Sequence, residues 1–280
     1  MAFDLKEFLK FIRIEHSTFD LPFAYMGVLL AGVFSVNVLI LVGIAGISAR
    51  TSGMIINRMM DLPLDNINPR TSDRALVTGK ISLREARIAL IASSSIFVIV
   101  AFSINMLAGI LSPIVILFFY LYPLTKRVPA ISHYVLGFSI GLIVLAGYVA
   151  AKDAFPSSIA PYLLMIFVSL WISAFDILYQ NSDYLFDTSM GMKTIPVLTK
   201  GRVDTPAGAT FFGALVSIAI FSFSSLLLLI MVFIVAVIIA VQMILWRKND
   251  PAFRDKVMLK FNFPIPFIIL FFLILYVLIG

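Results

Sequence analysis

The sequence predicts an all-α polytopic membrane protein with nine transmembrane helices. Hydrophobic residues make up 61% of the 280 residues and charged residues only 13%, whereas soluble domains contain roughly 25% charged residues. The chain also contains a series of apolar runs of about 20 residues, the length that a helix needs to cross a bilayer. Because the polar residues are too few to coat a water-facing surface, we expect lipid to surround most of the chain.

Nine apolar runs define the expected spans, which follow one another along the chain. They are residues 18–36, 38–59, 86–105, 107–123, 132–151, 159–182, 206–226, 227–246 and 261–279. Merging neighbouring runs at Asn105 to Gly109 or at Ser222 to Ser225 would give helices far too long for a bilayer, so short hairpins are expected there. We expect one domain over residues 1–280. Helices 1–4 and 5–8 would form pseudo-repeated halves around a central cavity, and helix 9 would be extra.

Lysine and arginine are distributed unequally between the two sides of this predicted bundle. With nine helices, 19 of the 21 Lys and Arg residues fall on the side of the N-terminus, only Lys152 falls on the other side, and Arg50 lies within the second span. Under the positive-inside rule the N-terminus is cytoplasmic and Gly280 lies outside. Topology and contact with anionic lipid account for the net charge of +6, so no nucleic-acid partner is expected.

The composition excludes several kinds of site. The chain has no cysteine, which excludes disulfides and thiolate-bound metals. Its two histidines, His16 and His133, are far apart in sequence, so a zinc or haem site built on histidine is not expected. Residues 1–18 contain three cations and three acids without an apolar core, so no cleavable signal peptide is expected.

Two long polar connections on the predicted cytoplasmic side carry matched pairs of aspartates. Asp61 and Asp65 lie four residues apart after the second span, and Asp183 and Asp187 repeat this spacing after the sixth. Four residues is about one helical turn, so each pair places two carboxylates on one face of a helix. The two pairs are offset by 122 residues, which suggests two halves of one site.

The acidic pairs have the chemistry of a magnesium site. Neighbouring carboxylates repel each other, and desolvation at the end of a membrane helix adds to this cost. Asp and Asn supply hard oxygen ligands, and Mg²⁺ usually takes one or two protein carboxylates and completes its shell with water and phosphate. We therefore expect two or more Mg²⁺ ions facing one diphosphate, with the ligands Asn57, Asp61, Asp65, Asp183 and Asp187.

These motifs together resemble the UbiA superfamily of intramembrane prenyltransferases. The Asn-x-x-x-Asp-x-x-x-Asp motif of that family matches residues 57–65, and its Tyr-x-x-x-Asp-x-x-x-Asp motif matches residues 179–187. The resemblance continues in residues 68–74 and 122–127 and covers roughly the first 200 residues. Residues 15–24 are similar to the branch that contains 4-hydroxybenzoate polyprenyltransferase and the menaquinone-pathway enzymes.

Two positions depart from the family pattern. Pro63 stands between Asp61 and Asp65, where it is expected to disturb the helix at the Met59 carbonyl. The first pair is therefore expected to be less regular than the second. Ala75 follows Arg74 at a position where the family usually has proline, so this loop is expected to be less stiff than in the family, with its charge unchanged.

The resemblance implies Mg²⁺-dependent transfer of a polyprenyl group from polyprenyl diphosphate to a small aromatic acceptor, in respiratory quinone biosynthesis at the cell membrane. The acceptor would be similar to 4-hydroxybenzoate or dihydroxynaphthoate. The implied catalytic residues are Asp61, Asp65, Asp183, Asp187 and Tyr179, whose ring would stabilise an allylic cation. The implied substrate-binding residues are Asn57, Arg50, Arg70, Arg74, Lys126, Arg127 and Lys193. Arg50, inside the second span, would bind the acceptor carboxylate or the diphosphate, or balance Asp176.

Three alternatives compete with this interpretation. The same chemistry could act on a different acceptor, geranylgeranylglyceryl phosphate or a haem precursor. A membrane transporter would place its acids near the bilayer midplane, whereas these acids cluster at helix ends. A CDP-alcohol phosphotransferase would carry an Asp-Gly-x-x-Ala-Arg run ahead of its acids, and the chain has none.

Overall fold

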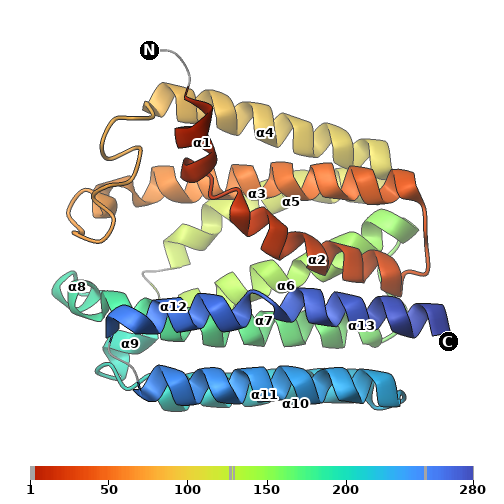
Figure 1. The fold of residues 1–280 in the computed structure, drawn as a ribbon. Helices are drawn as coiled ribbons and strands as arrows, with labels where there is room; N and C mark the ends of the chain where they lie inside the picture. The colour runs from red at the N-terminus through yellow and green to blue at the C-terminus, as the bar shows by residue number, and fades with distance from the viewer. Residues whose placement is uncertain (1–3, 126–127, 129, 249–250, 280) are drawn as a thin grey trace. The chain divides into compact units, whose positions relative to one another are not determined.

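The computed structural model describes residues 4–125, 128, 130–248 and 251–279. Over these ranges the chain forms helices and no strand, which confirms the predicted all-α fold (Figure 1). The elements are α1 (Leu5–Phe11), α2 (Glu15–Leu30), α3 (Val36–Asp65), α4 (Leu83–Ile104), α5 (Met106–Leu124), α6 (Ile131–Lys152), α7 (Ala160–Tyr179), the 3₁₀ helix η2 (Gln180–Asp183), α8 (Tyr184–Ser189), α9 (Ile195–Leu198), α10 (Asp204–Ser222), α11 (Leu226–Lys248), α12 (Pro251–Asn262) and α13 (Ile265–Ile279).

Eight helical segments within the described ranges are long and apolar enough to cross a membrane, and the chain is an integral membrane protein. These segments coincide with the second to ninth predicted spans. The first predicted span, 18–36, overlaps α2, which has 16 residues. A helix of that length extends for about 24 Å at 1.5 Å per residue, less than the roughly 30 Å hydrocarbon core. Each predicted apolar run therefore contains a helix, and the first is shorter than predicted.

Contacts between the helices divide the chain into two compact units. The first unit comprises Met1–Leu21 and Ser35–Leu124, and the second comprises Pro22–Phe34 and Thr125–Gly280. The first acidic motif therefore belongs to the first unit and the second motif to the second unit. The boundary at Leu124 falls where the first four predicted helices end.

In the first unit, local caps determine where α4 begins and ends. Ser82 and Glu85 form a capping box at its start, in which each side chain accepts a hydrogen bond from the other residue's backbone N–H. At its end, Asn105 leaves the helical conformation, and its side-chain oxygen accepts a hydrogen bond from the N–H of Ala108 at 2.8 Å. This bond caps the start of α5, which begins directly after Asn105. The predicted tight hairpin between the two helices is therefore present.

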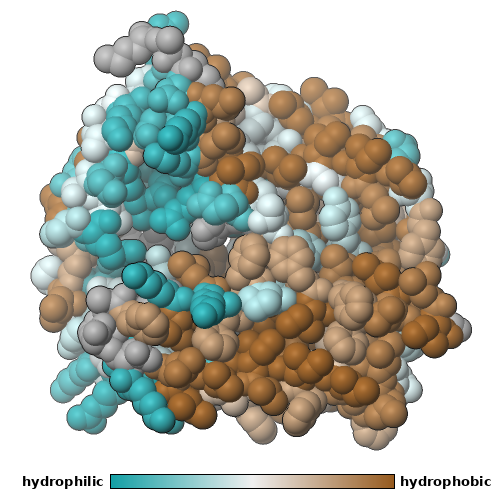
Figure 2. Space-filling view, in the orientation of Figure 1, coloured by the Kyte–Doolittle hydropathy of each residue, from teal (hydrophilic) through white to brown (hydrophobic). Residues whose placement is uncertain are grey.

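The short helix α1 packs onto the first unit through its apolar side. Phe11 lies in a core cluster with Ile55 and Ile56 of α3. On the polar side, Glu7 pairs with Lys10 at 3.3 Å and with Lys80 at 3.5 Å. The hydrogen bond from Lys10 lowers the pKa of the Glu7 carboxyl. Figure 2 shows a hydrophilic surface over this end of the unit, in contrast to the brown surface over the long helices.

In the second unit, glycines let helix backbones approach closely. A Cβ atom on Gly137 of α6 would lie 2.1 Å from the carbonyl oxygen of Ser169 in α7. Likewise, a Cβ atom on Gly147 would lie 1.9 Å from the carbonyl oxygen of Ala24 in α2. Small residues at helix contacts are typical of membrane proteins because dispersion contacts between backbones drive association there.

Aromatic and amide side chains join the remaining helices of this unit. Trp171 of α7 stacks on Phe167 with ring centroids 5.9 Å apart. Its indole N–H donates to the side-chain oxygen of Asn262 at 2.8 Å, which ties α7 to the junction of α12 and α13. The outer surface of α11 is apolar (Figure 2), as Phe233 with 70% exposure illustrates. Such a surface suits contact with lipid.

Candidate functional site

The first acidic motif lies on the last turns of α3. This helix continues to Asp65, beyond the predicted end of the span at residue 59. Each step of four residues rotates a side chain by about 40°, so Asn57, Asp61 and Asp65 share one face. Both aspartates are buried, with 9% and 6% exposure. The amide oxygen of Asn57 is also buried and has no hydrogen-bond partner within the described part of the chain.

Pro63 does not interrupt this motif, contrary to the sequence prediction. It lies inside α3, and the helix ends only after Asp65, where the N–H of Asn66 bonds to the Leu62 carbonyl. Proline removes the backbone bond to the Met59 carbonyl, but its φ near −65° is compatible with a helix. The one-face geometry predicted for the first pair is therefore present despite the proline.

The arginines near the first motif differ in their burial and in their contacts with its aspartates. Arg74 donates hydrogen bonds from Nη1 to both carboxylate oxygens of Asp65. Arg58, which the charge count assigned only to topology, is buried on α3 and interacts electrostatically with Asp61, Asp65 and Arg74. Arg70 is exposed, and its backbone N–H donates to the side chain of Asn68 at 2.9 Å. Of the predicted substrate-binding cations in this loop, Arg74 therefore contacts the motif directly.

Arg50 pairs with Asp20, whereas Asp176 pairs with His133. Its Nη1 lies 3.1 Å from Asp20 Oδ2, and the side chains are 22% and 9% exposed. The Nε of Arg50 is buried and has no hydrogen-bond partner in the described ranges. Asp20 was not singled out from the sequence, although a carboxylate within an apolar run is itself a signal that a cation lies nearby.

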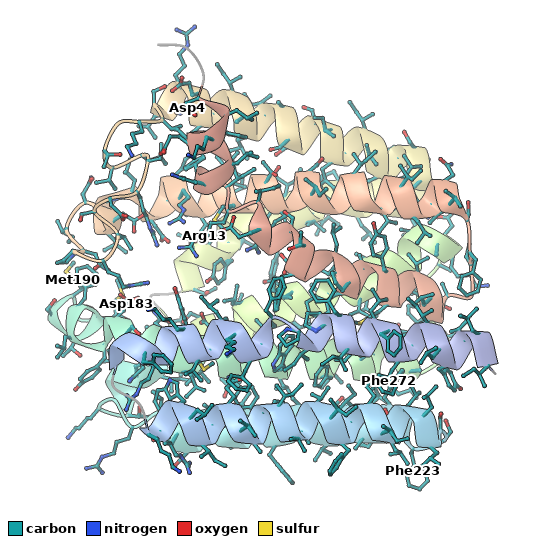
Figure 3. All side chains as sticks on the ribbon, in the orientation of Figure 1. Asp4, Arg13, Asp183, Met190, Phe223 and Phe272 are labelled. Atoms are coloured by element: carbon teal, nitrogen blue, oxygen red, sulfur yellow. The ribbon has the colours of Figure 1, made fainter. Side chains whose placement is uncertain are left out.

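The second motif does not form one continuous helix, which corrects the prediction for residues 159–182. Helix α7 ends at Tyr179, a 3₁₀ turn covers Gln180–Asp183, and α8 begins at Tyr184 (Figure 3). Asp183 has φ −94° and ψ 3°. A 3₁₀ turn has three residues per turn and shifts the phase of the following side chains. The irregular motif is therefore the second one and not, as predicted, the first.

The two aspartates of the second motif have different surroundings. Asp187 is 3% exposed, and its Oδ2 accepts hydrogen bonds from Thr194 Oγ1 and Gln180 Nε2, both at 3.2 Å. Asp183 is partly exposed. Tyr179 stacks on Phe175 with ring centroids 5.8 Å apart. The protein thus buries one carboxylate of this motif and leaves the other partly exposed.

A pair formed by buried His133 and partly buried Asp176 lies beside the second motif and was not predicted. His133 Nδ1 lies 2.7 Å from Asp176 Oδ2, and its Nε2 accepts the N–H of Ile195 at 3.3 Å. The sequence carried a signal for this contact, because both residues are polar groups within apolar runs. Because 43 residues separate them, the sequence did not indicate that the two residues pair.

Magnesium fits the donor set of each motif. The described residues contain no group of three or more His, Cys, Asp or Glu side chains that could hold a metal ion, so each motif offers its own two carboxylates. Mg²⁺ commonly binds through one or two carboxylates and fills its shell with water and phosphate. The unpartnered oxygen of Asn57 adds one hard donor to the first motif.

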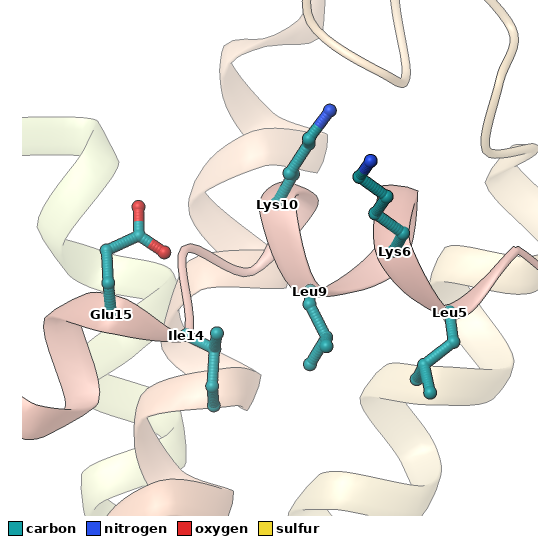
Figure 4. Close-up of a pocket in the computed structure, with 6 residues that line it drawn as sticks. All are labelled: Leu5, Lys6, Leu9, Lys10, Ile14 and Glu15. Atoms are coloured by element: carbon teal, nitrogen blue, oxygen red, sulfur yellow. The ribbon is translucent and has the colours of Figure 1, made fainter.

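Of the remaining predicted residues, one neighbours the second motif and two lie outside the described ranges. Lys193 is exposed, next to buried Thr194. Lys126 and Arg127 lie outside the described residues. A pocket of about 440 Å³ lies beside α1, with leucines on one side of the helix and lysines on the other (Figure 4). No motif residue lines it; the lining residues are Leu5, Lys6, Leu9, Lys10, Ile14 and Glu15.

One sequence relative and two solved structures show what this chain is similar to. The 4-hydroxybenzoate octaprenyltransferase of Francisella tularensis subsp. mediasiatica (strain FSC147) is 28% identical over 199 residues, which are 71% of this chain and 66% of that protein. The chain thus spans just under two thirds of the length of this relative. The apo structure of a UbiA homolog from Aeropyrum pernix K1 is 33% identical, with 94% and 98% coverage of the two chains and a TM-score of 0.83.

A more distant structure shares the fold. A UbiA homolog from Archaeoglobus fulgidus bound to GPP and Mg²⁺ has a TM-score of 0.73 at 18% identity, with 97% of this chain and 99% of that chain covered. A model of the UbiA prenyltransferase family matches residues 21–276. These residues include nearly all the membrane helices and both acidic motifs, so the chain belongs to the UbiA prenyltransferase family.

Proposed function

We propose that this protein transfers a polyprenyl group from a polyprenyl diphosphate to a small aromatic acceptor, as a step of respiratory quinone biosynthesis. The observation that carries the proposal is the pair of acidic motifs, each at the end of a membrane helix and each with a buried aspartate. The name of the Francisella relative supports an acceptor similar to 4-hydroxybenzoate.

Magnesium would be held by Asn57, Asp61 and Asp65 in one motif and by Asp183 and Asp187 in the other. When bound, it supplies Lewis-acid stabilisation of the negative charge on the departing diphosphate. The Archaeoglobus homolog that shares this fold was solved with GPP and Mg²⁺, and the hard oxygen donors here suit the same class of ligand. Two carboxylates per motif leave room for more than one ion.

Fixed cations of the chain contribute a second electrostatic effect. Arg74 is held by Asp65, so its charge is already oriented before a diphosphate binds, which avoids reorganisation during the reaction. Lys193 and Arg70 have exposed side chains, which are long enough to reach a phosphate at the surface. Arg58 adds buried positive charge close to both aspartates of the first motif.

The reaction breaks the bond between the allylic carbon and the diphosphate oxygen, and the electron pair leaves with the diphosphate. A ring carbon of the acceptor then forms a bond to the allylic carbon and loses its proton to a base. Tyr179, held against Phe175, would stabilise the positive charge by cation–π attraction of roughly 0.5–2 kcal/mol. The apolar helices exclude water, which would otherwise capture the cation.

Arg50 is our choice for recognition of the acceptor carboxylate. Its Nη1 is engaged by Asp20, but its buried Nε has no hydrogen-bond partner within the described ranges. An arginine has five donors, so the pair with Asp20 leaves capacity for a second carboxylate. A glycerol phosphate lipid or a haem precursor as acceptor remains the alternative within the family. A transporter is a weaker alternative, because the acids cluster at helix ends.

The test is a transfer assay with purified full-length protein. Labelled geranylgeranyl diphosphate would be incubated with 4-hydroxybenzoate, a dihydroxynaphthoate or geranylgeranylglyceryl phosphate, with and without Mg²⁺. We expect product with an aromatic acid, loss of product after chelation with EDTA, and recovery when Mg²⁺ is restored. No product with any acceptor, together with no Mg²⁺-dependent binding of the diphosphate, would overturn the proposal. Product only with the glycerol phosphate would overturn the choice of acceptor.

A further inference from the structure

His133 of α6 uses both ring nitrogens inside the second unit. The side chain is fully buried, Nδ1 lies 2.7 Å from Asp176 Oδ2, and Nε2 accepts the N–H of Ile195 at 3.3 Å. Because a backbone N–H can only donate, Nε2 carries no proton. The proton of a neutral imidazole is then on Nδ1, where it donates to Asp176. The ring is therefore held in one tautomer and one orientation.

The backbone that His133 binds leads directly to the second acidic motif. Thr194 precedes Ile195, is 1% exposed, and donates its hydroxyl to Asp187 Oδ2 at 3.2 Å. Just before it, the carbonyl of Lys193 accepts the N–H of Ala130 at 2.9 Å. Residues 193–195 are thus attached to the start of α6 on one side and to Asp187 on the other.

The packing of α6 against α7 makes this arrangement possible. Gly137 lies one turn after His133, and a Cβ atom there would lie 2.1 Å from both the Ser169 carbonyl oxygen and Ser173 Oγ. The backbones therefore meet closely next to the pair, which brings the histidine within bonding distance of Asp176. A larger residue at this position would push the two helices apart.

We infer that His133 and Asp176 are positioning residues, which hold residues 193–195 so that Thr194 keeps Asp187 oriented toward its cation. The inference rests on the proposed function, because it assigns Asp187 a ligand role. Neither residue of the pair needs to touch a substrate. Partners that hydrogen-bond a metal ligand, as Thr194 bonds to Asp187, commonly change metal affinity by about 10–100-fold when they are removed.

The experiment compares three variants of the full-length protein. His133→Leu removes both hydrogen bonds. His133→Gln is the conservative variant, because an amide can donate to Asp176 and accept from Ile195. Tyr134→Phe is the matched control: it removes a 3.2 Å hydrogen bond to Thr210 from the neighbouring position of α6 and does not alter the chain of contacts to Asp187.

Two readouts separate a positioning role from a general loss of structure. Hydrogen exchange of residues 190–199 in metal-free protein reports the segment itself, and Mg²⁺ titration reports the affinity of the site. For His133→Leu we expect faster exchange in this segment and about 10-fold weaker Mg²⁺ binding, with kcat at saturating Mg²⁺ less affected. His133→Gln should restore most of both, and Tyr134→Phe should resemble the wild type.

A double-mutant cycle of His133→Leu with Thr194→Val tests the route of the effect. The single variant Thr194→Val leaves His133 in place, so its effect on Mg²⁺ affinity tests the last step of that route without relying on the folding of His133→Leu. If His133 acts through Thr194, the effects of the two substitutions on Mg²⁺ affinity are not additive. Additive effects, or unchanged exchange of residues 190–199 in His133→Leu, would overturn the inference. Absence of Mg²⁺ binding and turnover in the wild type would overturn the proposed function instead, whatever the exchange experiment shows.

Discussion

The contact between Asp65 and Arg74 shows how one residue stabilises a motif whose two carboxylates repel each other. Two buried carboxylates one turn apart destabilise a helix, and Arg74 offsets this by donating to both oxygens of Asp65. In the second motif the compensation is different, because Thr194 and Gln180 donate to Asp187 without adding charge. Asp65 and Asp187, the last aspartate of each motif, therefore have different supporting contacts.

Asp183 is the more accessible acid of the second motif, and its substitution tests the role of that motif directly. We expect Asp183→Asn to lower turnover about 100-fold or more, because it removes the charge that would hold a cation against the diphosphate. The partly exposed position predicts little change in the midpoint of thermal unfolding. Asp73→Asn, in the exposed part of the α3–α4 loop, is the control and should retain turnover. Full activity of Asp183→Asn would show that the second motif is no metal site.

Variants of the Asp20–Arg50 pair distinguish a structural role of Arg50 from a role in binding the acceptor. Arg50→Gln leaves a buried carboxylate without its partner, which costs about 3 kcal/mol and lowers the midpoint of thermal unfolding by roughly 5–10 °C. The double variant Asp20→Asn with Arg50→Gln should regain most of this stability. If Arg50 also binds the acceptor carboxylate, KM for the acceptor stays raised by about 10-fold in the double variant. A KM that returns to the wild-type value would show that the pair is only structural.

At the scale of helices, backbone geometry decides which side chains reach a site. Pro63 lies within α3 and leaves Asn57, Asp61 and Asp65 on one face, whereas the 3₁₀ turn at Gln180–Asp183 changes the phase of the second motif. Glycines on α6 bring its backbone against α2 and α7. Helix contacts in this fold therefore depend on the absence of a side chain as much as on the presence of one.

A substitution of Gly147 tests the contact between α6 and α2. We expect Gly147→Ala to cost at least about 2 kcal/mol, because the added Cβ would meet the Ala24 carbonyl oxygen, which is backbone and cannot rotate away. Thermal unfolding in detergent would measure this as a midpoint lowered by roughly 5 °C. Gly208→Ala is the control: nothing in the described part of the chain lies within 4 Å of the point that its Cβ would occupy, and alanine is the better helix former by up to about 1 kcal/mol. Equal midpoints for the two variants would contradict the close approach of α2 and α6.

On the scale of the whole molecule, the distribution of charge determines the orientation that we propose in the membrane. The connections that carry the acidic motifs lie on the side of the predicted bundle that holds 19 of the 21 Lys and Arg residues. On the other side the sequence places only Lys152, at the end of α6. The positive-inside rule then places the N-terminus and both motifs on the cytoplasmic side. In this orientation, a water-soluble acceptor would reach the motifs from the cytoplasm.

The absence of cysteine makes this orientation easy to measure. Single variants Ser72→Cys, Ser189→Cys and Ser157→Cys each introduce one thiol at an exposed position. In intact cells, a membrane-impermeant maleimide should label Ser157→Cys only, because that residue lies between α6 and α7. In inverted vesicles it should label the other two. Labelling of Ser72→Cys in intact cells would reverse the proposed orientation.

The sequence by itself determined the class of fold and the identity of the two motifs. Apolar runs and cation asymmetry depend on composition and order alone, and the spacing of Asp61 with Asp65 needs only a helix to become a shared face. The pairing of Arg50 with Asp20, the burial of Arg58 and the contact of His133 with Asp176 needed the tertiary structure. Such features depend on which helix lies opposite, and spacing along one chain carries no information about that. The 3₁₀ turn also escaped prediction, because four-residue spacing is the same whether or not a helix is continuous.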